Sequence, residues 1–214
     1  MEQAGNGNTR ARLLDEAERL FATKGFEAVS IREITGAAQS NVAAVNYHFG
    51  SKENLYLAVF RERWVQRTRR IWESFSSQLA GQTKPAAKDI INALARTFLD
   101  GPLSDSERRY QAQLMQRELA HPGPALKMVV TEVMKPHQKQ VGDLLRPHLP
   151  ADVNEDRLRL YVLSIFGMTL HFTFARPAVS MITRHEYDSH FKYMLIDHIT
   201  AFALNGLDAL KGGA

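Results

Sequence analysis

Small and polar side chains that could contact nucleic acid are concentrated between residues 43 and 48. Ala43 and Ala44 would let a backbone approach base edges and thymine methyl groups. Asn46 can pair with adenine or a phosphate, and Tyr47 and His48 can donate hydrogen bonds to phosphate oxygens. The residue types alone are equally compatible with the ordinary surface of a short helix.

These residues belong to the second of two short helices that the sequence predicts. Ser30 and Glu33 have the spacing of a capping box, so a helix is expected over residues 31–38. A polar break ending at Asn41 follows, and Asn41 is placed to cap a second helix over residues 42–48. Two short helices with a tight polar break between them are the helix-turn-helix geometry, in which the second helix enters the DNA major groove.

The rest of the chain also has helical patterning. Thr9 is expected to cap a first helix that Gly25 ends, and Ser51 is expected to start a long helix to about residue 79. No run of alternating β-branched residues is long enough for a sheet, so the predicted fold class is all-α. A three-helix domain over residues 1–50 would be joined by the long helix to a six-helix domain over residues 51–214. The other predicted helices are 86–99, 107–120, 126–145 with a kink or break at Pro136, 158–175 and 187–210.

Composition excludes several functional classes. The 214 residues include no cysteine, which rules out disulfides, thiolate catalysis, Fe–S clusters and cysteine-type zinc sites. No window approaches the uninterrupted apolar length of a membrane span, and residues 1–8 lack the pattern of a signal peptide. The net charge of +4 permits a nucleic-acid partner without requiring one. We expect a cytoplasmic protein with no cofactor, no metal and no membrane partner.

Three separated blocks resemble the TetR family of bacterial transcriptional regulators. They are residues 21–26 (FATKGF), 29–34 (VSIREI) and 46–55 (NYHFGSKENL), which agree with the family in order and spacing. The resemblance covers residues 9 to about 58, and the run 41–49 is most similar to the CecR-type subgroup. The chain departs from the family pattern at residues 39–41, where the family usually has Gly, an aliphatic residue and Ser or Thr. It departs again at Asn46, where an aromatic residue is common.

The resemblance implies a homodimer that binds a palindromic operator and is released when a small-molecule inducer occupies the C-terminal domain. By the family pattern, Lys52 touches a phosphate. Ser30 could also donate to a phosphate, although its capping role competes. The residues that the family pattern turns toward DNA are Arg32, Val42, Ala43, Asn46, Tyr47 and His48.

Charge gives this interpretation weak support. Residues 1–55 contain six Lys and Arg against seven Asp and Glu, whereas phosphate neutralisation supplies much of the affinity for DNA. The acidic residues of the first helix can relieve this if they point away from DNA. The basic run between Arg61 and Arg70 is expected to be a solvated face with salt bridges, because Arg70 lies roughly 27 Å beyond Lys52 along a helix.

The C-terminal part offers candidates for a ligand site and for a dimer interface. Polar groups on otherwise apolar stripes could line a ligand pocket, with Met168 as a flexible wall, although such residues are more often plain core. Helix 158–175 is apolar on nearly all sides, and a stripe on helix 187–210 could pack with it against a second copy or within one chain. The ligand candidates are Arg117, Glu118, His137, Met168 and His171; the dimer candidates are Phe191, Leu195, Ile199 and Phe202.

Other classes fit the sequence less well. The chain has no HExxH pair, no Gly-x-Ser-x-Gly and no glycine-rich phosphate loop, so we expect no enzyme activity. A ligand-independent repressor and a helical adaptor that binds protein are the remaining alternatives. Burial of Tyr47, His48 and Lys52 would favour the adaptor.

Overall fold

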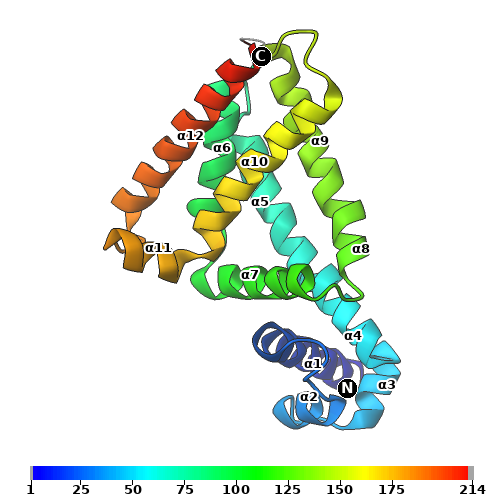
Figure 1. The fold of residues 1–214 in the computed structure, drawn as a ribbon. Helices are drawn as coiled ribbons and strands as arrows, with labels where there is room; N and C mark the ends of the chain where they lie inside the picture. Colours follow the sequence, from blue (N-terminus) through cyan, green and yellow to red (C-terminus); the bar gives the residue numbers. More distant parts are fainter. Residues whose placement is uncertain (1, 212–214) are drawn as a thin grey trace. The chain divides into compact units, whose positions relative to one another are not determined.

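The computed structural model describes the backbone of residues 2–211 and the side chains of residues 8–209. All regular structure in this part of the chain is helical, which confirms the predicted all-α class. In chain order the elements are α1 (Glu2–Lys24), α2 (Ile31–Ala37), α3 (Val42–Phe49), α4 (Lys52–Val59), η1 (Phe60–Trp64), α5 (Val65–Gln78), α6 (Ala87–Leu99), α7 (Asp105–Ala120), α8 (Leu126–Val129), η2 (Val130–Met134), α9 (Lys135–Leu145), η3 (Arg146–His148), α10 (Glu155–Phe174), α11 (Arg176–Thr183) and α12 (Ser189–Lys211) (Figure 1).

Side-chain caps start α2, α3 and α4 at the predicted residues. Ser30, Asn41 and Ser51 each accept a hydrogen bond from the backbone N–H three residues further along, at 2.9–3.1 Å. The carboxylate of Glu33 binds Lys24 at 2.6 Å. The capping-box spacing therefore predicts the start of α2 correctly, but Glu33 has a tertiary partner.

Several helix boundaries differ from the prediction. The first helix begins at Glu2, so Thr9 lies inside α1 and does not cap it. Extending an existing helix by one residue costs far less than nucleating a new helix. The helix can therefore continue past Thr9 toward the N-terminus, although Thr9 is a residue type that could cap it. The predicted helix 158–175 is followed directly by a further helix, α11, with Pro177 in its first turn, where the missing N–H of proline costs nothing.

The long helix that follows Ser51 is continuous but not uniform. It runs through α4, η1 and α5, and η1 is a π-helical segment at Phe60–Trp64. A second π-helical segment, η2, precedes α9, so Pro136 lies in the first turn of α9. At the predicted kink or break, the structure has a change in helical winding directly before the proline.

The helices pack into two compact units. Unit 1 comprises the described residues up to 69 together with residues 103–133, and unit 2 comprises residues 70–102 together with those from 134 onward. Helix α7 thus packs with the N-terminal helices, which its place in the chain does not indicate. The predicted functional boundary near residue 50 is a different division and stays a prediction.

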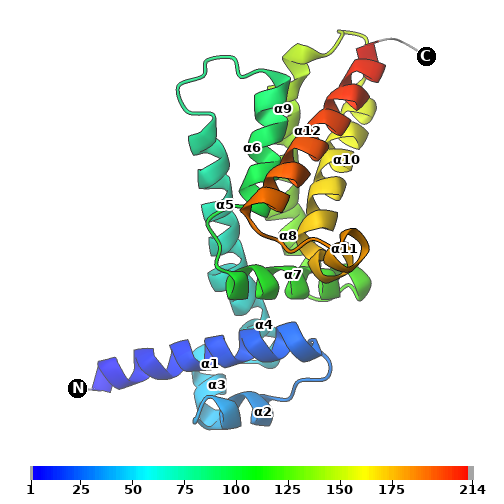
Figure 2. The ribbon, with the colours of Figure 1, turned by 90° about the vertical axis from the view of Figure 1, so that its left-hand side faces the viewer.

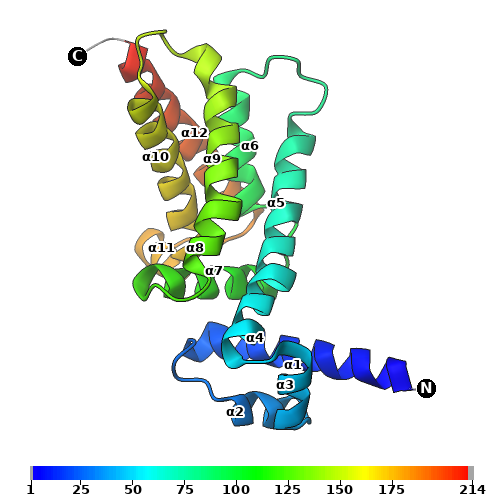
Figure 3. The same cartoon turned by 90° about the vertical axis from the view of Figure 1, so that its right-hand side faces the viewer.

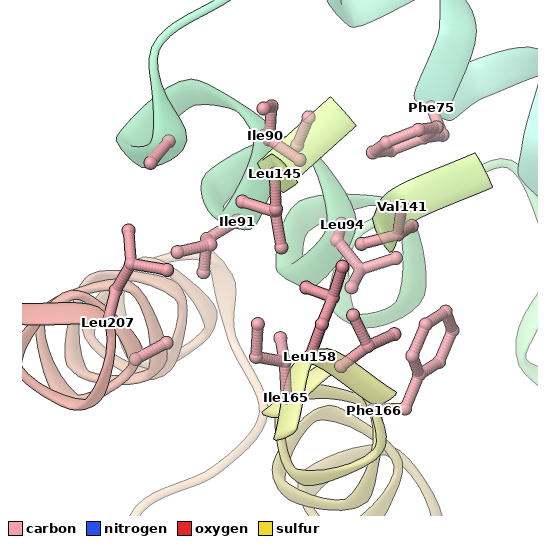
Figure 4. Packing of buried hydrophobic residues seen from close by; sticks show 14 of the residues in the cluster. Phe75, Ile90, Ile91, Leu94, Val141, Leu145, Leu158, Ile165, Phe166 and Leu207 are labelled. Carbon is pink, nitrogen blue, oxygen red and sulfur yellow. The ribbon is translucent and has the colours of Figure 1, made fainter. Parts of the chain in front are cut away.

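Each unit has its own core. In unit 1, α2 and α3 lie on one side of α1 and α7 lies on the other (Figures 2 and 3). In unit 2, α6, α9, α10 and α12 pack around an apolar cluster that includes Ile90, Leu94, Ile165 and Leu207 (Figure 4). Among the described residues no single helix is long and apolar enough to cross a membrane; α10 and α11 would satisfy that test only together, across an 81° bend.

Candidate nucleic-acid interface

Helix α3 has one buried face and one free face. Val45 and Phe49 are buried in unit 1, and the Arg10 guanidinium lies 5.0 Å from the centre of the Phe49 ring. On the other face, the side chain of Tyr47 is 75% exposed, and Asn46 is exposed beside it. A tyrosine with this exposure contributes little to the core, so its ring and hydroxyl are free to contact a partner.

The residues predicted to contact DNA come from the start of α2, from α3 and from the start of α4. Ser30 is the N-cap of α2, because its hydroxyl oxygen accepts a hydrogen bond from the backbone N–H of Glu33. The rings of Tyr47 and His48 meet edge to face with centres 5.0 Å apart. The exposed members are Ser30, Arg32, Val42, Ala43, Asn46 and Tyr47, and the half-buried members are Ala44, His48 and Lys52.

Lys52 is held near the loop between α1 and α2. Its Nζ donates to the Glu27 carbonyl at 3.4 Å and lies 4.5 Å from the centre of the Phe26 ring. Both contacts leave the ammonium half-buried, with donor capacity remaining. Its predicted contact with a phosphate therefore remains open to test.

Ion pairs between α1 and the long helix neutralise the acidic charge of the N-terminal segment. Asp15 binds Arg63 at 2.6 Å, and Glu18 binds Arg67 through two hydrogen bonds, one of them 2.9 Å long. The expectation of a solvated basic face is wrong for Arg67, which is only 8% exposed. It failed because the sequence does not show that α1 lies against this helix.

A third pair joins the same helices. Arg10 binds Glu62 through two hydrogen bonds, one of them 2.7 Å long, and this interaction holds the pKa of the Glu62 carboxyl below its ordinary value. The pair is partly exposed and contributes little stability by itself. Together with the pairs at Asp15 and Glu18, it fixes the position of α1 along the helix formed by η1 and α5.

Arg117, predicted to contact a ligand, contacts the end of α1. Its Nε donates to the Ala22 carbonyl at 2.8 Å, and a second guanidinium nitrogen donates to the Thr23 carbonyl. Gly25, with φ of 87°, ends α1 beside it, and a β-carbon at Gly25 would come within 3.2 Å of this guanidinium. Arg117 therefore satisfies carbonyls left open at the C-terminus of a helix.

Glu118, the next ligand candidate, is buried in the same unit at 1% exposure. Its carboxylate accepts the Tyr56 hydroxyl at 2.5 Å and the Gly123 backbone N–H at 3.1 Å. Burial, together with the hydrogen bond to Glu118, raises the pKa of Tyr56, so the phenol stays protonated as a donor. The pair links α4 to α7.

The other three ligand candidates lie in unit 2. His137 stacks on Trp72 with ring centres 4.0 Å apart and planes parallel to within 1°. Met168 is half-buried against the core, and His171 is exposed beside Phe172. A groove of about 770 Å³ lies between α9 and α10, with Leu158, Val162 and Leu163 among its lining residues, but none of the five candidates lines it. No group of three His, Asp or Glu side chains that could hold a metal ion occurs within the described residues.

Three of the four dimer candidates belong to the core of their own chain. Phe191, Leu195 and Ile199 are at most 6% exposed and pack in a cluster with Leu99 of α6. These three are therefore unavailable to a second copy, because intrachain packing covers the stripe. Only Phe202, at 61% exposure, presents its side chain to solvent.

A different apolar face on α10 and α12 is exposed. Of the predicted stripe, this face contains only Phe202. This exposed apolar face consists of Leu160, Leu163, Tyr193, Met194 and Phe202, whose exposures range from 44% to 64%.

Comparison with known proteins agrees with this geometry. The model of the bacterial regulatory proteins of the tetR family matches residues 13–59, which hold the helix-turn-helix. The model of the C-terminal domain of the HTH-type transcriptional dual regulator CecR matches residues 87–207, more than half of the chain.

Individual relatives point the same way. The chain is 27% identical to the dual regulator CecR of Shigella flexneri over 183 residues, 81% of this chain and 79% of that protein. It is 42% identical to the transcriptional repressor AcnR of Corynebacterium glutamicum over 55 residues, 26% of this chain and 29% of that protein. A tetR-family regulatory protein from Rhodococcus RHA1 shares the fold, with a TM-score of 0.63 at 18% identity, over 93% of this chain and 96% of that one. These relatives are transcriptional regulators, not enzymes, and the chain belongs to the TetR family of DNA-binding transcriptional regulators, with a C-terminal domain of the CecR type.

Proposed function

We propose that this protein is a cytoplasmic homodimeric repressor whose two α3 helices bind the half-sites of a palindromic operator. The observation that carries the proposal is the free outer face of α3, where Tyr47 is 75% exposed on a helix whose other face is buried. Repression, in preference to activation, is supported by the AcnR relatives, which are repressors and match this chain in the helix-turn-helix segment.

The exposed apolar face on α10 and α12 supports the dimer. Phe202 and Leu160 are each more than 60% exposed, and apolar side chains grouped in this way mark association surfaces. A face of this kind, matched with the same face of a second copy, forms a two-fold interface between helix pairs. Such a dimer would carry two α3 helices, one for each half-site.

We further propose that a small-molecule inducer releases the operator. Support comes from α7, because Arg117 and Glu118 contact α1 and α4, the helices that carry α2 and α3. Any ligand that moves α7 would therefore disturb the DNA-binding helices. The five ligand candidates are divided between the two units, and none of them lines the groove between α9 and α10. This favours a second possibility, a repressor that needs no ligand.

Substitutions on the free face of α3 and at the start of α4 test the DNA contact. We expect Tyr47→Ala to weaken operator binding about tenfold, because it removes a base or phosphate contact worth roughly 1–3 kcal/mol. Lys52→Ala should weaken binding to all DNA sequences alike and reduce the salt slope by about 1. Gel-shift titrations at several salt concentrations, with DNA from upstream of the protein's own gene, measure both effects.

Arg109→Ala is the matched control for the loss of charge. Arg109 is an exposed cation on α7 of the same unit, and α7 lies on the other side of α1 from α3. We expect its affinity and salt slope to equal those of the wild type. Unchanged affinity of both Tyr47→Ala and Lys52→Ala at matched salt would contradict the assignment of this surface to DNA.

A thermal-shift screen of hydrophobic small molecules tests the inducer. Each compound that raises the melting temperature is added to the protein–operator complex, and the operator Kd is measured with and without it. We expect at least one such compound to weaken operator binding by about 5–150-fold, the usual range of coupling between two sites. If every stabilising compound leaves the operator Kd unchanged, the ligand-independent repressor is the correct description.

A further inference from the structure

The turn between α2 and α3 contains a residue in a conformation that favours glycine. After α2 ends at Ala37, Gln39 has φ of 49°, its N–H donates to the Gly36 carbonyl at 3.3 Å, and the Ser40 N–H donates to the Thr35 carbonyl at 2.9 Å. This pair of bonds is a Schellman motif, and its left-handed position is usually glycine. A residue with a side chain is strained there.

The same chain uses glycine at other positions of this kind. Gly25, Gly50 and Gly81 have φ between 80° and 87°. Within the described residues, only Gln39 and Arg184 have a positive φ together with a side chain. Strained residues cluster at functional sites, and Gln39, unlike Arg184, lies within the helix-turn-helix.

The surroundings of Gln39 leave its amide free. Ala38 is buried in the core, Ser40 is half-buried, and the Asn41 side chain caps α3. Gln39 is exposed, and its amide has no hydrogen-bond partner among the side chains and backbone of residues 8–209. The turn thus presents a single unengaged amide, with a donor and an acceptor, directly before the N-terminus of α3.

We propose that Gln39 is a specificity-determining DNA contact, whose amide reads a base edge in the major groove next to the bases read by α3. A glutamine amide can form a bidentate pair with adenine, which matches the N6 donor and N7 acceptor of that base. The N-terminal residues of a recognition helix are those that contact base edges, and Gln39 lies two residues before the N-cap of α3. The strained backbone conformation is retained because it directs this side chain toward DNA.

The substitution Gln39→Gly separates this role from a structural one, because the two roles predict opposite results. It removes the strain, so the melting temperature should stay the same or rise by about 1–3 °C. It also removes the amide, so affinity for a duplex that the wild type selects from a random pool should fall about tenfold. Binding to an unselected duplex of equal length, and the salt slope, should not change, because a base contact neutralises no phosphate.

Arg184→Gly is the matched control. It relieves the same kind of backbone strain at the end of α11 in unit 2, so its melting temperature should respond as that of Gln39→Gly does, with no change in affinity. Affinity of Gln39→Gly within twofold of the wild type overturns the proposal, and so does an equal loss on both duplexes, which would mean a phosphate contact. If Tyr47→Ala also binds like the wild type, the whole DNA surface is misplaced; if Tyr47→Ala binds weakly, only the role of Gln39 is wrong.

Discussion

Replacing Arg67 by alanine is expected to lower the free energy of unfolding of unit 1 by about 3–5 kcal/mol, because the change leaves the Glu18 carboxylate buried without its partner. The side chains of Arg67 and Glu18 are 10% and 5% exposed, so water cannot replace the lost guanidinium. Arg67 also lies 3.7 Å from Glu107 of α7, so its loss removes a contact with two helices of the unit.

Urea unfolding followed by the fluorescence of Trp64 measures this loss. Trp64 is buried in unit 1, and the only other tryptophan, Trp72, lies in unit 2 and can be replaced by phenylalanine in every variant compared. Trp64 donates its indole N–H to the Gln111 carbonyl at 3.1 Å, so its emission reports on the contact between the long helix and α7.

Arg63→Ala is the matched control, one turn earlier on the same helix. Its pair with Asp15 is more exposed, at 30% and 62%, so its removal should cost less than about 1 kcal/mol. Replacing both members of the buried pair, as Arg67→Met with Glu18→Leu, should recover most of the loss, because no unpaired charge then remains. Equal costs for Arg67→Ala and Arg63→Ala would show that burial does not govern the strength of these pairs.

An aspartate at Phe202 is expected to convert the proposed dimer into a folded monomer. Phe202 is 61% exposed within one chain, so the charge is solvated in the monomer and is costly only when a second copy covers it. A monomer can engage only one half-site, so operator affinity should fall by at least about 100-fold, the advantage that linked binding provides. Light scattering at micromolar concentration gives the oligomeric state, and circular dichroism confirms that the helices are retained.

Two control substitutions bracket this result. Gln82→Asp places the same charge at an exposed position between α5 and α6 and should leave both the dimer and the operator affinity intact. Phe191→Asp places it in the core of unit 2, at a residue with 4% exposure, and should unfold that unit. A wild-type monomer at micromolar concentration, or a Phe202→Asp variant that still dimerises, would contradict the proposed interface.

Much of the fold follows from interactions between residues close in sequence. Ser30, Asn41 and Ser51 each bond a backbone group three residues away, so the start of a helix is encoded within a few residues, and these starts were predictable. The motif blocks around Phe21 and Tyr47 likewise indicate the family, because they reflect a local helix-turn-helix. The strained turn at Gln39 was visible in the sequence only as a departure from the family pattern, since φ cannot be read from residue types.

What only the tertiary structure decided concerns partners far apart in the chain. Arg117 contacts a carbonyl 95 residues away, and Glu118 contacts a hydroxyl 62 residues away, so these two residues, which were predicted to contact a ligand, hold α7 against α1 and α4. Phe191, Leu195 and Ile199 were predicted to lie in a dimer interface, but α6 of the same chain covers them. Helical periodicity determines which side chains share a face of a helix; which helix covers that face depends on how the chain packs, and periodicity contains no information about that packing.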